Sequence, residues 1–419
     1  MDSLRWQSLL GLLVFTGLAW ALSDNRRAIT GRILGRTVVA GLGLQLVLAA
    51  VLLHVPGTER AFIWLNNVLL ALEGATEAGT RFVFGYLGGG ETPFEVAKPQ
   101  HTYILAFRAL PLVLVTSALS ALLYHWRVLP LLVKAFARVL ARTLDVGGAV
   151  GVNAAANVFV GMVEAPLYVR PYLSRLSRGE LFMVMSCGMA TVAGTVLVLY
   201  ASILRPVMPD ALGQILIASV VSAPAAIMVA RLMVPPEGDP TSADLSRDAV
   251  EGETTMHAVA RGTSDGLQVL LNIVAFVIVL IALVHLANSL LQGVFGESIT
   301  LQGLLGIAMR PVAWLLGVPW QEAAAAGDLI GTKVVLNELM AYQELAGLAE
   351  AGTLGDRSVR LLTYALCGFA NFGSLGIMVG GLSAMAPDRR HDVVTLGPRS
   401  IVAGLLATCL TGSVVGLIG

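Results

Sequence analysis

Long runs of apolar residues recur along the chain and constrain its fold more than any other feature. They cover residues 6–22, 37–54, 103–124, 181–204, 211–234, 267–291, 358–385 and 398–418. Each run is near or above the roughly 20 residues that an α-helix needs to cross a bilayer. Only 13% of the residues are charged, well below the roughly 25% of a typical soluble domain. We therefore expect an all-α polytopic membrane protein with about eight transmembrane helices, which needs the lipid bilayer as part of its solvent.

Charge and metal-binding residue types exclude several classes of function. The formal net charge is +0, so nothing favours a nucleic-acid partner. The 3 cysteines lie in apolar runs without a CxxC spacing, and the 6 histidines form no HExxH pair. No convincing nucleophile and base, and no metal-ligand cluster, can be found for an intramembrane enzyme. We expect a protein that is not an enzyme and has no cofactor.

The first apolar run has two interpretations, a cleaved signal peptide or a retained helix. Ala19-Trp20-Ala21 resembles a cleavage site. However, Arg5 is the only basic residue before the run, and the run is longer than the usual h-region of about 7–15 residues. We therefore interpret it as a retained membrane helix.

The distribution of basic residues between the runs predicts the orientation in the membrane. The basic segments contain Arg26, Arg27, Arg32 and Arg36, then Arg127, Lys134, Arg138, Arg142, Arg170, Arg175 and Arg178, and finally Arg389, Arg390 and Arg399. The positive-inside rule places them in the cytoplasm, while the more acidic stretch 59–98 belongs outside. Eight crossings of a bacterial inner membrane then put both termini in the periplasm. The polar loop 237–265 falls inside and is expected to be flexible.

Two apolar regions, residues 146–173 and 311–345, are too polar and too interrupted by proline and glycine to face lipid along their length. Irregular backbone at membrane depth persists only where protein or a water-filled cavity covers it. We interpret both as re-entrant hairpins. A pair of interfacial helices is the alternative.

The segments that follow the two hairpins begin alike. The first reads Cys187-Gly188-Met189-Ala190-Thr191, and the second reads Cys367-Gly368-Phe369-Ala370-Asn371. The order of hairpin, broken helix and helix thus occurs twice, and the predicted topology inverts one unit relative to the other. Inverted repeats with discontinuous helices are typical of secondary transporters, whose site lies at the repeat interface near the midplane.

Each hairpin carries a glutamate, Glu164 in the first and Glu338 in the second. A charge at the bilayer centre costs about 2.5–3.5 kcal/mol on insertion scales, so it persists where it meets a cavity, a partner or a ligand. A structural ion pair with a base such as Lys333 or Arg108 is the simpler explanation. Substrate binding is the functional one, and both roles can coexist.

The residues near Glu338 suit a polyhydroxyl ligand such as ribose. Asn371 and Ser374 are three residues apart, so they share a face on helical backbone. A carboxylate accepts hydrogen bonds from hydroxyl groups, and an asparagine amide both donates and accepts them. Phe369 is close enough in sequence to stack beside the ligand, although it can equally serve in helix packing.

Asn157 and Thr191 suit an alkali cation. Such an ion is bound by neutral or anionic oxygens, which an amide, a hydroxyl group and unwound carbonyls supply. Gly161 and the glycines around Thr191 make unwinding inexpensive. The same two polar residues could instead only satisfy the broken backbone.

At these residues the chain resembles the concentrative nucleoside transporters over nearly its whole length. The resemblance rests on Ala-Ala-Asn-Val-Phe-Val-Gly from Ala155, Glu164-Ala165-Pro166-Leu167 with Arg170-Pro171, Gly317-Val318-Pro319-Trp320, Asn337-Glu338 and Cys367-Gly368-Phe369-Ala370-Asn371. It implies a homotrimer in which a transport domain of two hairpins and two broken helices moves against a scaffold. It also implies sodium or proton symport of nucleosides into the cell.

The resemblance assigns roles to individual positions. Asn157, Val160, Thr191 and Val192 match the sodium site, with the two valines contributing carbonyl groups. Met162, Val163, Glu164, Val196, Glu338, Phe369, Asn371 and Ser374 match positions that bind the nucleoside. Thr191 stands where relatives carry serine, and its hydroxyl group can serve equally.

One departure from the family pattern concerns the tip of the first hairpin. Relatives often carry Gly-Gln-Thr-Glu or Gly-Gln-Ser-Glu, whereas this chain reads Gly161-Met162-Val163-Glu164. Met162 and Val163 cannot hydrogen-bond the edge of a base, and an apolar site discriminates weakly. Our hypothesis is a nucleoside carrier with altered base preference, tolerant of purines or of a modified nucleoside.

The predicted organisation has five parts. Residues 1–129 form scaffold helices with an interfacial segment, 130–235 the first transport repeat, 236–264 a cytoplasmic loop, 265–300 a scaffold helix and 301–419 the second transport repeat. Sodium is the expected coupling ion. A proton-coupled carrier of the same fold is the alternative, since two membrane carboxylates could relay protons, and a passive channel is a more remote one.

Overall fold

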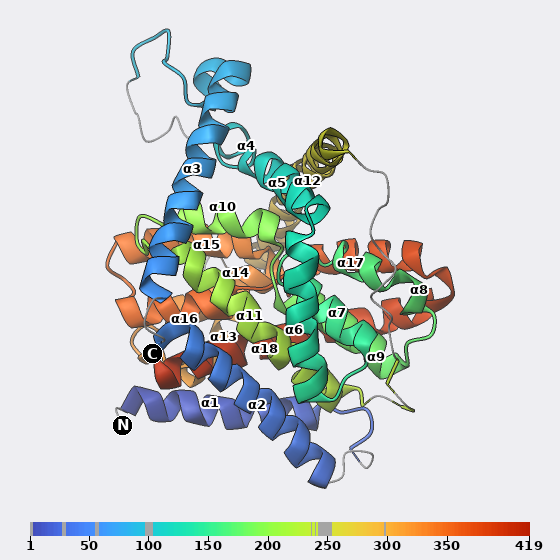
Figure 1. Cartoon of the computed structure of the whole chain (residues 1–419). Helices are drawn as coiled ribbons and strands as arrows, with labels where there is room; N and C mark the ends of the chain where they lie inside the picture. The colour runs from blue at the N-terminus through green and yellow to red at the C-terminus, as the bar shows by residue number, and fades with distance from the viewer. Residues whose placement is uncertain are drawn as a thin grey trace.

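The computed structural model describes residues 3–26, 31–54, 58–96, 104–235, 237–238, 240–241, 254–296 and 299–419. Within these ranges the chain forms helices joined by turns and no strand, which confirms the all-α fold class (Figure 1). The N and C marks lie close together at one edge of the molecule, where α1 packs against α18.

The N-terminal part of the chain supplies the first seven elements. They are α1 (Ser3–Ala21), α2 (Gly31–His54), α3 (Thr58–Phe84), η1 (Gly85–Gly88), α4 (Leu105–Arg108), α5 (Leu112–His125) and α6 (Val128–Leu144). The helix α3 occupies much of the acidic stretch that the sequence analysis placed outside without assigning a structure.

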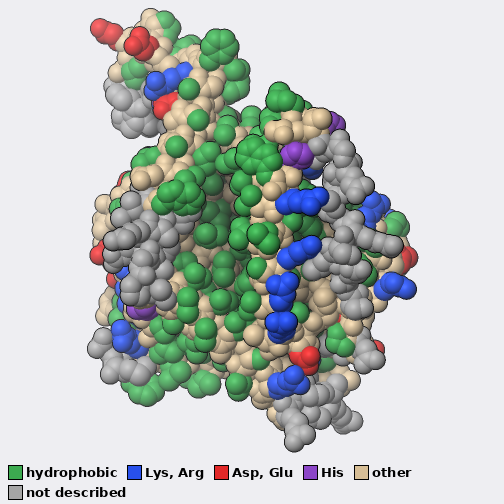
Figure 2. Space-filling model, in the orientation of Figure 1, with side chains coloured by type: hydrophobic (Ala, Val, Ile, Leu, Met, Phe, Trp, Pro, Cys, Tyr) green, Lys and Arg blue, Asp and Glu red, His purple; other side chains and the backbone are tan. Residues whose placement is uncertain are grey.

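The helix α6 presents a basic stripe to the surface. Lys134, Arg138 and Arg142 are exposed and four residues apart, so they form one row along the helix. Figure 2 shows this column of basic side chains over α6, beside a face covered mainly by apolar side chains. A surface this apolar is expected where lipid is the solvent.

Six helical segments in the described part of the chain are long and apolar enough to cross a membrane. They are Leu34–His54, Leu105–His125, Arg178–Leu204, Ala211–Met233, Thr255–Val294 and Pro387–Ile418. The other two predicted spans correspond to α1, which has 19 residues, and to two helices separated by a break. The count of eight crossings therefore stays a prediction, as do the domain boundaries.

The region after α6 contains the first break-rich unit. It consists of α7 (Gly148–Asn157), η3 (Ala165–Val169), α8 (Arg170–Leu173), α9 (Arg178–Ala190), α10 (Gly194–Leu204) and α11 (Ala211–Met233). A capping box of Ser177 and Glu180 starts α9. The helix ends where Thr191 adopts extended backbone, and α10 begins only at Gly194. The predicted broken helix is therefore present.

The second unit repeats this order with one difference from the prediction. Its elements are α13 (Leu301–Leu316), α14 (Ala323–Val335), α15 (Glu338–Glu350), α16 (Asp356–Leu366), α17 (Phe372–Met385), η4 (Pro387–Arg389) and α18 (Arg390–Ile418). The predicted start of the second hairpin at residue 311 was wrong, because Pro311 lies within α13. That helix ends at Gly317, whose left-handed backbone favours glycine. The two helices at the position of the second predicted hairpin are α14 and α15, which are separated at Leu336 and Asn337.

The two broken helices meet at their breaks. The backbone N–H of Phe369 donates a hydrogen bond of 3.3 Å to the carbonyl oxygen of Thr191. Gly368 allows this approach, since a Cβ there would lie 2.9 Å from the carbonyl oxygen of Met189. Polar backbone exposed by one break is thus partly satisfied by the other, as burial away from water requires.

The long helix α12 (Thr255–Phe295) begins earlier than the predicted span at residue 267. The hydroxyl group of Thr254 caps it by accepting a hydrogen bond from the N–H of His257. Ten residues assigned to the cytoplasmic loop are therefore helical. Most of the remaining loop, from 242 to 253, lies outside the described residues.

Close packing of α18 on α9 depends on Gly404, where a Cβ would lie only 2.6 Å from the Cβ of Met189. We expect Gly404→Val to destabilise the protein by about 1–3 kcal/mol, because overpacking a tight contact forces both helices to shift. The measurement is the unfolding midpoint of detergent-purified protein. Gly376→Ala, on α17 with nothing within 4 Å of the added Cβ, is the control. Equal midpoints for both variants would contradict the packing argument.

Candidate functional site

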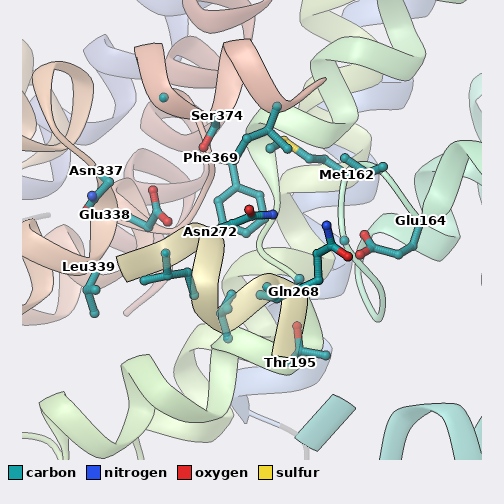
Figure 3. Close-up of a pocket in the computed structure, with 18 of the residues that line it drawn as sticks. Met162, Glu164, Thr195, Gln268, Asn272, Asn337, Glu338, Leu339, Phe369 and Ser374 are labelled. Atoms are coloured by element: carbon teal, nitrogen blue, oxygen red, sulfur yellow. The ribbon is translucent and has the colours of Figure 1, made fainter. Parts of the chain in front are cut away.

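A cavity of about 520 Å³ lies where the two breaks, the two hairpins and α12 converge. Figure 3 shows side chains from these elements directed into it. All eight residues that the resemblance assigned to nucleoside binding line this cavity: Met162, Val163, Glu164, Val196, Glu338, Phe369, Asn371 and Ser374. The structure therefore brings together positions that are up to 212 residues apart (162 to 374).

Glu338 is held firmly at one end of the cavity. It is the first residue of α15, whose N-cap Asn337 accepts a hydrogen bond from the N–H of Met340. One carboxylate oxygen accepts a hydrogen bond of 2.6 Å from the Tyr200 hydroxyl group, and the other accepts one of 2.9 Å from Asn371 Nδ2. Only 4% of Glu338 is exposed. The N-terminus of α15 also favours a negative charge here.

Asn371 connects Glu338 to the second break. While its Nδ2 donates to Glu338, its Oδ1 accepts a hydrogen bond of 2.7 Å from the N–H of Ser374 and so caps α17. The amide thus uses both its donor and its acceptor, which fixes its orientation. Phe369 lies on the same break and projects into the cavity between Glu338 and the tip of the first hairpin (Figure 3).

Glu164 is arranged differently, at the opposite end of the cavity. The residue is exposed and lines the cavity. The carboxylate folds back over Gly161, where any Cβ would overlap it. Asp265 of α12 lines the same cavity. Glu164 is therefore placed where a ligand in the cavity can reach it.

The four residues assigned to a cation lie beside the cavity and do not line it. Asn157 and Thr191 are each 1% exposed. Asn157 donates to the carbonyl oxygen of Asn153, but its Oδ1 has no hydrogen-bond partner among the described residues. A buried acceptor without a donor carries a free-energy cost that a cation would remove. This orphaned oxygen fits a cation site.

A backbone hydrogen bond joins the two segments that carry the other cation-site positions. The N–H of Gly194 donates a hydrogen bond of 3.2 Å to the carbonyl oxygen of Phe159, which ties the first break to the hairpin tip. Val160 lies in the hairpin tip and Val192 in the first break, and neither carbonyl oxygen accepts a backbone hydrogen bond among the described residues. Both oxygens are therefore available as ligands.

Comparison with known proteins identifies the family. A model described as "Na+ dependent nucleoside transporter C-terminus" matches residues 214–416, its N-terminal counterpart matches 10–87, and one described as "Nucleoside recognition" matches 106–207. The nucleoside permease NupC of Helicobacter pylori is 32% identical, with 98% of this chain and 97% of the relative covered. The chain belongs to the Na⁺-dependent nucleoside transporter family.

Other members of this family extend the comparison. The sodium/nucleoside cotransporter 1 of Mus musculus is 33% identical over 98% of this chain and 63% of its own length. The structure of CNTnw in an inward-facing substrate-bound state is 37% identical, with a TM-score of 0.88 over 99% of this chain and 97% of that chain. These relatives are transporters and permeases, which confirms that this nucleoside transporter family member is not an enzyme.

The sequence analysis missed several residues of this transporter's cavity. Tyr200, Thr195, Asp265, Gln268 and Asn272 also line it. The last three stand at spacings of three and four on α12, so they share one helix face, and this polar stripe in an apolar run was the available signal. Tyr200 carried no such signal, because its contact with Glu338 joins residues 138 apart in sequence.

The suggested ion pair of Glu338 with Lys333 is not formed. Lys333 is 0% exposed and lies on α14. Its Nζ donates hydrogen bonds of 2.9 Å to the carbonyl oxygen of Ala365 and 3.1 Å to Thr408 Oγ1. The ammonium group therefore stabilises the C-terminal end of α16 beside the break, where a positive charge is favourable.

Tyr200→Phe tests how far the free protein depends on the hydrogen bond to Glu338. Loss of the hydroxyl group leaves a buried carboxylate oxygen without its donor, so we expect destabilisation of about 1–3 kcal/mol. The measurement is the unfolding midpoint without substrate. Tyr86→Phe, in η1 and 44% exposed, is the comparison and should keep the native midpoint. A midpoint for Tyr200→Phe equal to that of the native protein would show that this hydrogen bond is not a stabilising one.

Proposed function

We propose that this protein is a sodium-coupled symporter that carries nucleosides into the cell by alternating access. One observation supports the proposal most strongly. The Glu338–Asn371–Ser374 group adjoins the second break, and the orphaned Asn157 oxygen lies beside Gly188, in the helix that leads into the first break. A backbone hydrogen bond joins the two breaks. A polyhydroxyl site and a cation site on one mobile unit are what symport requires.

The ribose of the nucleoside would bind at Glu338. A carboxylate accepts hydrogen bonds from two vicinal hydroxyl groups, and Asn371 and Ser374 beside it offer an amide and a hydroxyl group. Ligand hydroxyl groups would replace or extend the hydrogen bonds that Tyr200 and Asn371 make in the free protein. Phe369 would pack against the nucleoside, and Val196 would lie beside the base.

Sodium would bind between α7 and the first break. Asn157 would contribute Oδ1, Thr191 its hydroxyl oxygen, and Val160 and Val192 their carbonyl groups. Inward movement of one positive charge gains about 2.3 kcal/mol per 100 mV, which is enough to concentrate a neutral solute. Ion binding at the break next to the hairpin tip would order the tip that carries Glu164.

Proton coupling is the second candidate, and one observation favours it. Glu164 and Asp265 line the same cavity. Acidic groups in a membrane cavity can bind a proton on one side of the membrane and release it on the other. In this version Asn157 and Thr191 would only satisfy the broken backbone.

The protein would act as a homotrimer in a bacterial inner membrane with both termini in the periplasm. The N- and C-terminal helices pack side by side, which supports placing the two termini on the same side.

Uptake of radiolabelled nucleosides into proteoliposomes tests the function. Saturable accumulation that needs an inward sodium gradient supports sodium symport. Accumulation that persists without sodium and collapses with a protonophore supports proton coupling. Uptake that only equilibrates, without saturation, would identify a passive channel and overturn the proposal.

Asn157→Ala tests the cation site. Removal of Oδ1 should raise the sodium concentration for half-maximal uptake by roughly ten- to 150-fold, since a lost charge-assisted contact contributes about 1.5–3 kcal/mol. Thr191→Ser keeps the hydroxyl oxygen and should retain the native sodium dependence, whereas Thr191→Val should not. If sodium dependence stays the same in Asn157→Ala and Thr191→Val, sodium binds elsewhere.

Met162→Gln combined with Val163→Thr tests the altered base preference. The two polar side chains would restore hydrogen bonding to the edge of a base, so uptake of uridine should rise relative to that of purine nucleosides. Initial rates of uptake for a panel of nucleosides measure the change. Unchanged selectivity would remove the hairpin tip from base recognition.

A further inference from the structure

One wall of the cavity comes from α12, which is outside both break-rich units. Its lining residues are Asp265, Gln268, Val269, Asn272, Ile273 and Val277. The polar members follow one edge of this face at spacings of three and four, and the apolar members follow the other at spacings of four. Gln268 and Asn272 project toward the space between Phe369 and Glu164 (Figure 3).

The rotation of α12 about its axis is fixed by tight packing on α5. A Cβ on Gly266 would lie 2.8 Å from the Cβ of Ser117, and one on Gly262 would lie 2.6 Å from the Cβ of Ala121. At 3.6 residues per turn, the edge with Asp265, Gln268 and Asn272 is roughly a quarter turn away from these glycines. The contact with α5 therefore directs the polar edge into the cavity.

The same helix α5 also supports the break-rich side of the cavity. The hydroxyl group of Thr116 donates a hydrogen bond of 2.8 Å to the carbonyl oxygen of Thr195, just after the first break. Thr195 and its neighbour Val196 both line the cavity. The polar edge of α12 is thus held at a defined position relative to α10.

The polar edge has unused hydrogen-bonding groups. Between described residues, neither the Gln268 amide nor the Asn272 amide makes a side-chain hydrogen bond, although both are exposed to the cavity. Asp265 and Glu164 add two carboxylates, which accept hydrogen bonds and do not donate them when ionised. Acceptors thus outnumber donors, so this end of the cavity fits a ligand group rich in N–H.

The position of these groups relative to Glu338 indicates which part of a nucleoside they meet. Glu338 lies at one end of the cavity and Glu164 at the other, with Phe369 between them (Figure 3). A nucleoside with its ribose at Glu338 would direct its base toward Glu164 and α12. Met162 and Val163 at the hairpin tip offer no polar side chain to that base.

We propose that Asp265, Gln268 and Asn272 of α12, together with Glu164, read the base and select nucleosides that carry an exocyclic amino group. This inference rests on the proposed nucleoside transport. An amino group donates to a carboxylate, while a carboxamide side chain can both donate to and accept from the adjacent edge of the base. An oxo group at the same ring position directs lone pairs at the carboxylates instead, and a polar site rejects such a mismatch strongly.

Two pairs of nucleosides test this preference, adenosine with inosine and cytidine with uridine. Within each pair the exocyclic amino group is replaced by an oxo group, and the adjacent ring nitrogen changes from an acceptor to an N–H donor. We expect adenosine and cytidine to inhibit uptake of radiolabelled adenosine about tenfold more strongly than inosine and uridine do, because one charge-assisted hydrogen bond separates them. Asp265→Asn and Gln268→Leu should each reduce this ratio at least threefold. Leu271→Ala, exposed on α12 and not part of the cavity lining, should leave it unchanged.

Nucleoside-induced shifts of the unfolding midpoint in detergent provide a second measurement that does not require a working transport cycle. Equal inhibition within both pairs by the native protein would overturn the inference. So would an amino preference that Asp265→Asn and Gln268→Leu leave intact. A protein that takes up and binds no nucleoside would instead overturn the proposed function, and the inference with it.

Discussion

The backbone hydrogen bond between Phe369 and Thr191 is the contact on which the rest of the site depends. Two helices that stop inside an apolar protein each expose peptide groups that lipid cannot satisfy. Here each break faces the other, and the tip of the first hairpin pairs with Gly194. Breaks satisfied in this way can leave selected carbonyl groups free, and the free groups are where a cation or a polar solute can bind.

The two glutamates of the cavity show how burial divides roles between identical side chains. Glu338 has partners on both oxygens and a helix N-terminus behind it. Glu164 folds over Gly161 and lines the opposite end of the cavity. A carboxylate of the first kind presents a fixed geometry, as recognition of a constant ribose requires. One of the second kind can adapt to a variable partner.

Much of this arrangement could be predicted from the sequence, because broken apolar runs and membrane carboxylates are costly unless they serve a purpose. The sequence predicted that both helices are broken, as the order of the elements shows at Thr191 and Asn371. The structure brings the eight residues assigned to the nucleoside to one cavity, while their role in binding stays a prediction. The start of the second hairpin was misplaced, since the sequence alone does not show that a helix accommodates Pro311. Tyr200 was missed because its relevance arises from a contact with Glu338 that is far away in sequence. The polar edge of α12 was missed although its helical spacing is visible in the sequence.

The packing of α5 has a consequence for how substrate range can change. Thr116 holds one wall of the cavity, and Ser117, the next residue, sets the distance of α12 through its contact with Gly266. These two adjacent residues act as a spacer between the wall that carries Val196 and the wall that carries Gln268. A larger or smaller side chain at residue 117 would therefore alter the width of the cavity that is available to a base. The residues that contact the base would stay the same. The substrate selectivity of such a protein can therefore change through a substitution at a contact between two helices, outside the binding site.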